Sequence, residues 1–433
     1  MTTKKTIMIF ASILMASMLA ILVGCADEQK KPKETSKLKE AAYEAFIYAY
    51  PMMEQVKTVN GMFEFMGMKP NVVAMNSTFP MENVGMPIVA PNLTSMTGGM
   101  FIDISAGPVT LEIPEVKDRY LVYQFIDVFT HNFYYLGTRG NNGEAGRFTL
   151  YNKNQQKPAG NVGTPVLVEG DHAIVTARID IKDRAELDRV HEIQKAIEIV
   201  SAPSQTRVYP KYDKKKAFSP AFVEYLNELL TDVPESEKTL FARFAAIGVM
   251  NKVELSDNDL KEIQEGIDAA FEAIQAESKN LEIGNGYVGA TEIFGTREYL
   301  NGNYLGRAAG AHFGLWGNSK EEANYFMLHT EGEGQIRFEK NELPPLTDLG
   351  FWSVTVHDEN VLVKENEHDS YVLTMDKMKF AEDGSLTLSI SSKPQEGNWL
   401  FTPGGKMVVL IRAYQADNKK IDDYVPPAFV KNK

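Results

Sequence analysis

The chain of 433 residues has few of the side chains that build covalent or metal-bound scaffolds. It has one cysteine, Cys25, which excludes an intramolecular disulfide and a cysteine metal cluster. Its seven histidines are scattered, and no two have the four-residue spacing that places both on one helical face, so we predict no metal site. The Gly-x-Ser-x-Gly motif is missing, which leaves an α/β-hydrolase mechanism without support. We predict no cofactor.

Positive charge is also scarce. The chain has 45 Lys and Arg against 58 Asp and Glu, a formal net charge of −13. Such a surface repels phosphate backbones, so nucleic acid is not an expected partner. Hydrophobic residues make up 44% of the chain, which is ample for packed cores, and a chain of this length predicts two or three domains.

The N-terminus has the pattern of a secretion signal. Lys4 and Lys5 precede an apolar run, residues 7–23, that carries no charge. The end of this run, Leu22-Val23-Gly24-Cys25, resembles the lipobox that is cut before a lipidated cysteine. We therefore predict that residues 1–24 are a lipoprotein signal peptide and that Cys25 is the lipid attachment site. The alternatives are a plain secreted protein and an uncleaved single span.

The residues after Cys25 predict the destination. Residues 25–39 are nearly all polar or charged and are typical of a solvated tether. Ala26 stands where an aspartate would resemble an inner-membrane retention signal. We therefore expect lipid anchoring in the bacterial cell envelope, on the periplasmic side of the outer membrane rather than at the inner membrane.

The body of the chain alternates between helical and β patterns. Residues 38–64 carry apolar side chains at helical spacing, with an interruption or kink near Pro51. Short β-rich runs separated by Gly, Asn and Pro occupy residues 101–178. Helical patterns follow over most of 184–278, and strands return between 351 and 414. The sequence therefore predicts a mainly β fold with a helical middle segment.

These elements carry residue patterns that resemble a known family. The first half contains Asp103-Ile104-Ser105-Ala106-Gly107-Pro108, Asp118-Arg119-Tyr120, Asp127 and Gly137-Thr138-Arg139. The second half contains Leu343-Pro344-Pro345, Phe351-Trp352-Ser353-Val354-Thr355, Asp383-Gly384-Ser385-Leu386, Asn398-Trp399-Leu400 and Arg412-Ala413-Tyr414. In this order they resemble the bacterial lipoprotein family that combines domain of unknown function 1254 with domain of unknown function 1214. The resemblance implies an immunoglobulin-like β-sandwich, then helices, then a jelly-roll-like β domain, and it implies no established reaction.

The predicted boundaries follow from this resemblance and from the patterns. Residues 40–180 form an N-terminal helix and a β-sandwich of the 1254 type, residues 181–280 a helical segment, and residues 281–433 a C-terminal β domain of the 1214 type. Two stretches depart from the family. Where relatives tend to carry Asn-x-Asp-Thr-x-Tyr, residues 92–97 lack the aspartate and the tyrosine, and where an Arg-Tyr pair and a second arginine are usual, the chain has Ser370-Tyr371 and Asp376.

One polar cluster is a candidate site. Asp127 shares a strand face with aromatic residues, and a buried carboxylate is costly unless it is paired. Arg139 or Arg119 are candidate partners. The functional interpretation is a ligand-binding cluster of Asp127, His131, Asn132 and Arg139 at the sandwich rim. The structural alternative, which we favour, is a salt bridge that fixes the loop.

Two tryptophans in the last third of the chain, Trp352 and Trp399, are candidate aromatic contacts for a sugar, although aromatic residues in strands more often fill cores. We expect a membrane-anchored envelope lipoprotein that acts as a binding or structural module. Its expected partner is a small polar, carbohydrate-like ligand or an envelope component, and exposed sheet edges predict a homo-oligomer. The alternative is a hydrolase-type enzyme acting on a glycan or ester through carboxylates such as Asp127.

Overall fold

The computed structural model describes residues 36–85, 91–283, 287–288 and 293–432. The predicted signal peptide, Cys25 and the predicted tether up to residue 35 lie outside these ranges. The residues from Ser36 onward form one compact unit. Among the helices of this described part, none is both long and apolar enough to cross a membrane.

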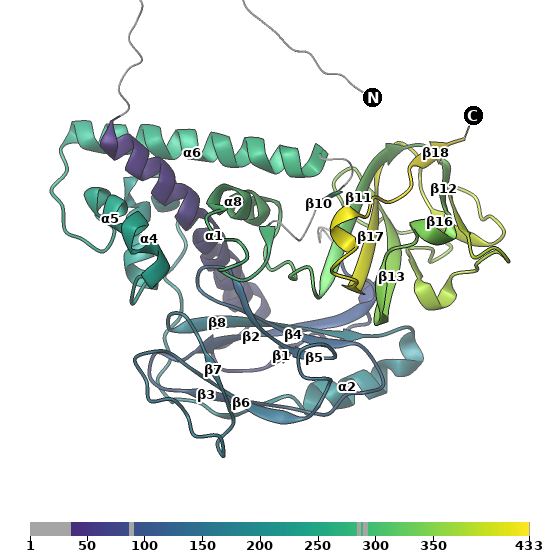
Figure 1. The fold of residues 1–433 in the computed structure, drawn as a ribbon, viewed down its shortest axis with the longest axis horizontal. Helices are drawn as coiled ribbons and strands as arrows, with labels where there is room; N and C mark the ends of the chain where they lie inside the picture. Colours follow the sequence, from purple (N-terminus) through teal and green to yellow (C-terminus); the bar gives the residue numbers. More distant parts are fainter. Residues whose placement is uncertain (1–35, 86–90, 284–286, 289–292, 433) are drawn as a thin grey trace, which may run out of the picture. The chain divides into compact units, whose positions relative to one another are not determined.

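The first β region is a sandwich of two sheets (Figure 1). One sheet has the order β1-β2-β8-β4-β5, with bounds Ala74–Met75, Ser95–Asp103, His172–Asp180, Leu121–Ile126 and Asn132–Gly137. The other has the order β7-β6-β3-β9, with bounds Thr164–Leu167, Gly146–Tyr151, Val109–Ile113 and Glu198–Ser201. Alternate residues on the facing sides, such as Ile102 of β2 and Leu111 of β3, share one buried core.

The second β region is also a two-sheet sandwich. One sheet has the order β10-β11-β17-β13-β14, with bounds Tyr287–Val288, Ala323–Glu331, Lys406–Ala416, Leu346–Asp358 and Val372–Thr374. The other has the order β16-β15-β12-β18, with bounds Asn398–Phe401, Leu386–Ser391, Gly334–Phe338 and Phe429–Lys431. Trp352 of β13 and Phe338 of β12 pack in the core between the two sheets.

The two sandwiches have the same strand order. Each strand from β1 to β9 has a counterpart nine strands later, and the same neighbours pair in both copies. The agreement includes the one parallel pair of each copy, β6 with β7 and β15 with β16. The described body is therefore an internal repeat, although the resemblance implied two different sandwich types. The immunoglobulin-like and jelly-roll-like classes stay predictions, and any class given to one copy must also fit the other.

The agreement extends to single residues of the central strands. In β4, Val122 lies opposite Arg178 of β8, and in β13, Ser353 lies opposite Arg412 of β17. Each arginine then donates to the side chain two residues further along its partner strand. Arg178 reaches Gln124 at 3.0 Å, and Arg412 reaches Thr355 at 2.8 Å. Aligned on these pairs, residues 120–127 correspond to residues 351–358.

Each repeat is preceded by a long helix. The first, α1 (Lys37–Met66), continues through the buried Pro51, so the predicted interruption does not end it. The second is α6 (Asp257–Ile283), which lies alongside α1 (Figure 1). Gly266 of α6 faces the main chain of α1 at Lys39, where an added Cβ has no room.

Shorter helices complete the helical layer. They are α3 (Lys214–Ala217), α4 (Val223–Leu229), α5 (Lys238–Phe244) and α8 (Tyr304–Phe313). This layer shares a buried core with residues on the outer face of the first sandwich, including Phe101, Ile126 and Ile174. The helices therefore cover one face of the sheet that contains β4 and β8 (Figure 1).

One predicted helix is shorter than expected. The helical pattern over residues 184–200 becomes α2 (Leu187–Lys195), after which the chain enters β9 and pairs with β3. The first sandwich therefore extends to Ser201 rather than to residue 180.

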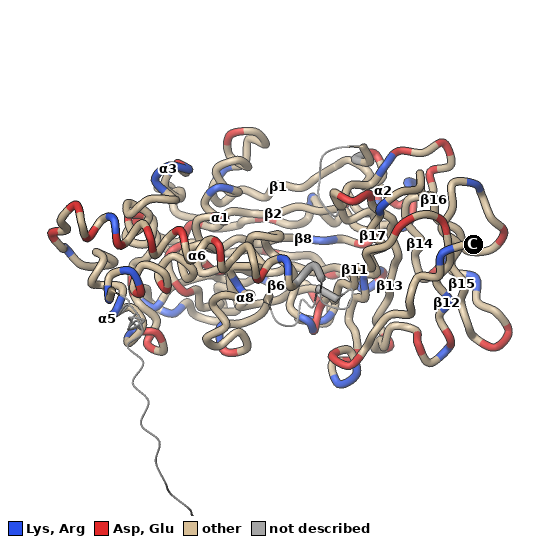
Figure 2. The backbone as a smooth tube through the Cα atoms, turned by 90° about the horizontal axis from the view of Figure 1, so that it is seen from above, with Lys and Arg blue, Asp and Glu red and all other residues tan. Residues whose placement is uncertain are grey.

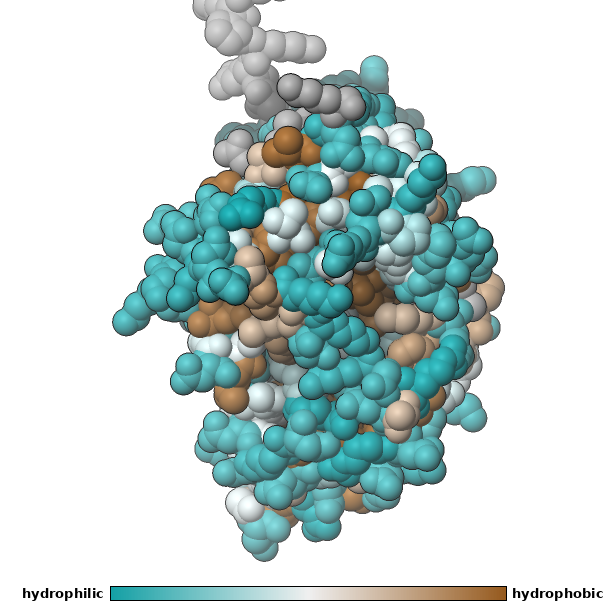
Figure 3. All heavy atoms as spheres, turned by 90° about the vertical axis from the view of Figure 1, so that its right-hand side faces the viewer, coloured by the Kyte–Doolittle hydropathy of each residue, from teal (hydrophilic) through white to brown (hydrophobic). Residues whose placement is uncertain are grey.

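Acidic and basic residues are interspersed along most of the chain in the view of Figure 2, whereas α3 carries three consecutive lysines. On the face that Figure 3 shows, hydrophobic residues lie in small groups among hydrophilic ones. This face therefore presents polar chemistry to a partner rather than a broad apolar platform.

Candidate functional site

Asp127 ends β4 and shapes the loop that leads into β5. Its Oδ1 accepts the backbone N–H of His131 at 2.8 Å, and its own carbonyl accepts the N–H of Thr130 at 3.1 Å. The loop closes with the N–H of Asp127 donating to the His131 carbonyl at 3.0 Å. Thr130 has a φ of 72°, so the turn is held in a conformation that a threonine rarely adopts.

The second repeat has the same loop. Asp358 Oδ1 accepts the N–H of Leu362 at 2.9 Å, and the Asp358 carbonyl accepts the N–H of Val361 at 3.0 Å. Val361 has a φ of 59°, matching Thr130. The aspartate therefore shapes the loop in both repeats through backbone hydrogen bonds, and not through the arginine salt bridge of the structural alternative. The loop side chains after the aspartate differ, and the fifth position is His131 in the first repeat and Leu362 in the second.

His131 connects Asp127 to an arginine on α8. Its Nδ1 lies 3.4 Å from Asp127 Oδ2, and its Nε2 lies 3.2 Å from Arg307 Nη1. A guanidinium only donates, so Nε2 must accept, which assigns the ring proton to Nδ1 facing the carboxylate. Burial lowers the pKa of His131 below its usual value, and the ring is therefore neutral at pH 7.

Arg307 is held almost completely inside the protein, with 3% of its surface exposed. Nη1 donates to the Phe129 carbonyl and Nη2 to the Tyr48 carbonyl, both at 2.9 Å. The guanidinium lies 4.9 Å from the centre of the Tyr48 ring, which favours a cation. Its Nε is buried and has no hydrogen-bond partner among the described residues.

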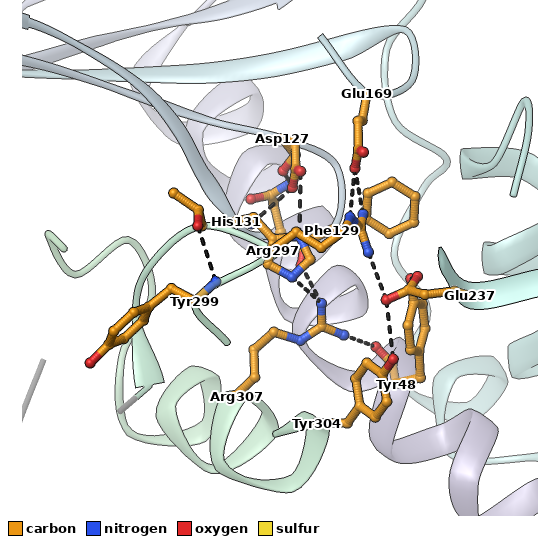
Figure 4. Close-up of polar contacts among 12 residues, drawn as sticks. Tyr48, Asp127, Phe129, His131, Glu169, Glu237, Arg297, Tyr299, Tyr304 and Arg307 are labelled. Carbon is orange, nitrogen blue, oxygen red and sulfur yellow. Dashed lines mark hydrogen bonds and ion pairs between the residues drawn. The ribbon is translucent and has the colours of Figure 1, made fainter. Parts of the chain in front are cut away.

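A second arginine is surrounded by carboxylates. Arg297 Nη1 lies 2.7 Å from Glu237 Oε1, and Nη2 lies 2.5 Å from Glu169 Oε2 (Figure 4). Glu237 is buried and also accepts the Tyr48 hydroxyl at 2.5 Å and the Tyr304 hydroxyl at 3.2 Å. Burial raises the pKa of Tyr48 well above its usual value, so its hydroxyl remains a donor.

These side chains surround a small cavity at the N-terminal end of α8. We call it the α8 pocket, lined by His131, Glu237, Arg297, Asn303, Tyr304 and Arg307 among others. Its free volume of about 30 Å³ has room for one or two water molecules. The pocket therefore combines donors and acceptors from both repeats and from the helical layer in one partly enclosed polar site (Figure 4).

The structure separates the predicted polar cluster. Asp127 and His131 are paired, and His131 lines the α8 pocket. Asn132 instead donates to the Gly317 carbonyl at 3.0 Å and to Ser319 Oγ at 3.1 Å, and so holds the segment between α8 and β11. Arg139 Nε lies 2.7 Å from Glu322 Oε2 in the second repeat. Neither Arg139 nor Arg119, which pairs with Asp118 and Glu186, is the partner of Asp127.

The two candidate tryptophans lie far from this pocket in the chain and have different environments. Trp352 is 2% exposed and fills the core of the second sandwich beside Phe338. Trp399 is half-buried on β16, and its indole N–H donates to Ser391 Oγ at 3.0 Å. Trp352 therefore has no open face for a sugar in this structure.

The residues that could hold a metal are dispersed. Across the described ranges there is no group of three or more His, Cys, Asp or Glu side chains placed to bind a metal ion. The α8 pocket itself offers two arginines, which repel cations. Its chemistry suits a small polar or anionic group.

Several site residues were missed by sequence reasoning. Tyr48, Glu237, Arg297 and Arg307 come from four segments that are distant in the chain, and none of them stands in a recognisable motif. One sequence signal was present. Residues 120–127 and residues 351–358 both pair an aromatic start with a terminal aspartate, and this would have pointed to the repeat.

Two family models match the chain, in the predicted order. Residues 70–201 match "Protein of unknown function (DUF1254)", and residues 318–418 match "Protein of unknown function (DUF1214)". The first match runs from just before β1 to the end of β9, and the second covers most of the second sandwich. The predicted pairing of these two domains is confirmed, and its lipoprotein character stays a prediction. A comparison with curated proteins gives no match.

A solved structure shares the architecture. The chain is similar to the VPA0106 protein from Vibrio parahaemolyticus, with a TM-score of 0.75 at 20% identity over 92% of this chain and 100% of that one. It is also similar to a putative uncharacterized protein from Burkholderia cenocepacia, with a TM-score of 0.44 at 12% identity over 91% and 94% of the two chains. The first of these shows that the fold is shared, and it says nothing about activity.

Proposed function

We propose that this protein is a binding module that takes a small polar, carbohydrate-like ligand at the α8 pocket. The observation that carries the proposal is the buried Nε of Arg307, which has no hydrogen-bond partner among the described residues and belongs to a residue that lines the pocket. A buried donor without a partner costs about 1–3 kcal/mol, and an oxygen atom of a ligand would recover that cost. Tyr304 and Asn303 add hydroxyl and amide groups, which suit the alternating donors and acceptors of a sugar.

A thermal-shift screen tests this proposal. The full-length chain, purified in detergent, is heated with sugars and organic acids, and native mass spectrometry identifies carried-over ligands. We expect a rise in Tm with one class that Tyr304→Phe reduces and Arg337→Gln, on the outside of β12, leaves unchanged. A folded sample that responds to no class would count against a small ligand and favour a structural or protein-partner role.

We further propose that the binding module is an envelope lipoprotein tethered through Cys25, with the outer membrane as its destination. The support is the signal pattern of residues 1–24 and Ala26 after the cysteine. In cells fed labelled palmitate, the chain should carry the label and fractionate with membranes, and Cys25→Ala should lose both properties. Unlabelled wild-type protein in the soluble fraction would overturn this part.

The alternative function is a hydrolase acting on a glycan or ester. One observation favours it: a carboxylate faces a neutral histidine that lines the pocket and whose Nε2 accepts from Arg307. Asp127 itself would act through His131, because both of its oxygens already have partners. Turnover of chromogenic glycosides or esters that is lost in His131→Gln, with a bell-shaped pH profile, would establish this alternative. Ligand-induced stabilisation without turnover would exclude it for those substrates.

We also propose a fold class for the sandwiches and an oligomeric state for the protein. The family resemblance implies an immunoglobulin-like class for the first sandwich and a jelly-roll-like class for the second. The shared strand order instead supports a single class for both copies, which is what we propose. Homo-oligomerisation through sheet edges is proposed on the general hazard of open edges, and light scattering on the purified chain tests it.

A further inference from the structure

The α8 pocket holds two arginines, and only one is neutralised by carboxylates. Arg297 contacts both Glu237 and Glu169. Arg307 donates only to two carbonyl oxygens and to His131, and no carboxylate of the described residues lies within ion-pair distance of it. Asp127 is separated from Arg307 by the neutral ring of His131, and Glu237 acts on the Arg307 guanidinium only through space. A buried positive charge therefore remains without direct compensation.

The start of α8 adds positive potential at the same place. Asn303, Tyr304 and the preceding Gly302 line the pocket, and the Asn303 side chain caps the helix by accepting the N–H of Gly306 at 3.1 Å. The N-terminal end of this ten-residue helix favours an anion. The unpartnered Nε of Arg307, in the next turn of α8, is an independent sign of a missing acceptor.

The dimensions of the pocket limit the group that can enter. The inner volume of about 30 Å³ matches one or two water molecules and therefore one carboxylate group, but not a sugar ring. Beyond this inner space the pocket is partly open to solvent. A ligand would therefore insert an acidic tip and leave its body at the mouth, beside Tyr304 and Asn303.

We propose that the α8 pocket recognises the carboxylate of an acidic sugar or similar small acid, with Arg307 as the anchoring cation. This inference rests on the proposed binding function and names its ligand class. Glu237 is paired with Arg297, so Arg307 is left as the cation for the ligand. This pairing sets the orientation of the ligand, whose carboxylate points toward Arg307. A charge-assisted bond from a buried guanidinium is worth roughly 1.5–3 kcal/mol, which corresponds to about tenfold or more in affinity.

The first experiment varies the ligand and keeps the wild-type chain. Full-length protein in detergent is titrated by calorimetry with sodium glucuronate, sodium galacturonate, glucuronamide and glucose. Glucuronamide replaces the carboxylate by a neutral amide of nearly the same outline. We expect at least one uronate to bind about tenfold or more tightly than glucuronamide, with an affinity that falls as salt is raised.

The second experiment varies the protein. Arg307→Lys keeps a cation but has no Nε donor, and we expect it to lose most of the preference for the uronate. Because Arg307 also supports the fold, Tyr304→Phe at the rim serves as a second variant that keeps the buried cation. Arg337→Gln is the matched control, since Arg337 is exposed on the second sandwich and pairs with Glu339.

The outcomes separate this inference from the proposed function. Equal binding of uronate, amide and glucose would overturn the carboxylate assignment and leave the binding module in place. Binding of neutral sugars without binding of the uronates would also overturn the carboxylate assignment and leave the binding module in place. No binding of any of these ligands, together with a silent thermal-shift screen, would overturn both.

Discussion

At the scale of single residues, the aspartates at corresponding positions of the two repeats have different partners. Asp127 and Asp358 each use one oxygen to shape a loop. The second oxygen of Asp127 faces His131, whereas that of Asp358 faces Lys364 at 2.9 Å. Sequence reasoning found the polar character of Asp127 and His131. It did not find Arg307, the partner of His131, because the local sequence at these positions does not show which distant segment packs against them.

The loop role of the two aspartates predicts matched losses of stability. Asp127→Ala and Asp358→Ala should each lower the free energy of unfolding by about 1–3 kcal/mol, because each removes the acceptor of a loop N–H. Asp127→Asn keeps an acceptor and should lose less. Urea denaturation followed by circular dichroism measures all three. An Asp127→Ala protein as stable as the wild type would contradict the loop role.

Buried neutral histidines predict sensitivity to acid. Burial lowers the pKa of His357 to about 3, and it also lowers that of His172. In the unfolded chain a histidine titrates near 6.5, so between these values the unfolded state binds more protons. The free energy of unfolding should therefore fall as the pH drops from about 6.5, by about 1–2 kcal/mol per histidine between pH 7 and pH 5.

His357→Ile tests this contribution, because Ile126 holds the corresponding position in the first repeat. The variant should be less sensitive to pH between 7 and 5 in urea denaturation than the wild type. An unchanged slope of stability against pH would show that His357 titrates normally.

At the scale of elements, local patterns predicted some strands and missed others. The region of β-rich runs predicted over residues 101–178 contains β3 to β7 and most of β8. The helical pattern that ends at residue 200 fails over β9, because pairing with β3 overrides local preference there. The strands β11 and β12 were not predicted, although β11 lies beside the central β17.

Arg139 links the first repeat to the second, and its removal should destabilise that junction. Glu322 is 1% exposed, and Arg139 and the Tyr120 hydroxyl are its two side-chain partners at 2.7 Å. Arg139→Met should lower the free energy of unfolding by about 1–3 kcal/mol, less than for a fully buried pair because Arg139 is about one-third exposed. Arg147→Met removes an exposed pair with Glu112 and should cost less than about 1 kcal/mol. If Arg139→Met and Arg147→Met lower the free energy of unfolding equally in chemical denaturation, this result would contradict the role assigned to Arg139.

At the scale of the whole molecule, the repeat predicts that the two halves hold together without a covalent link. The aromatic rings of Tyr120 and Phe351, at corresponding positions, lie 5.2 Å apart, and α1 packs against α6. A protease site placed in the exposed stretch between Lys252 and Val253 should be cut in the folded chain. After cleavage, both fragments should elute as one particle in size-exclusion chromatography. Separate elution under native conditions would show that the covalent link is required.

The sequence by itself determined the signal pattern, the acidic balance, the alternation of helical and β regions and the pairing of the two families. These depend on composition, periodicity and motifs that are local in the chain. Only the tertiary structure decided that both β regions share one strand order and that Arg307, His131 and Glu237 meet around one pocket. The physical reason is that strand order and burial arise from contacts between segments far apart in the chain. The guanidinium of Arg307 becomes a candidate anchor for a ligand only because those contacts bury it away from water and from carboxylate partners.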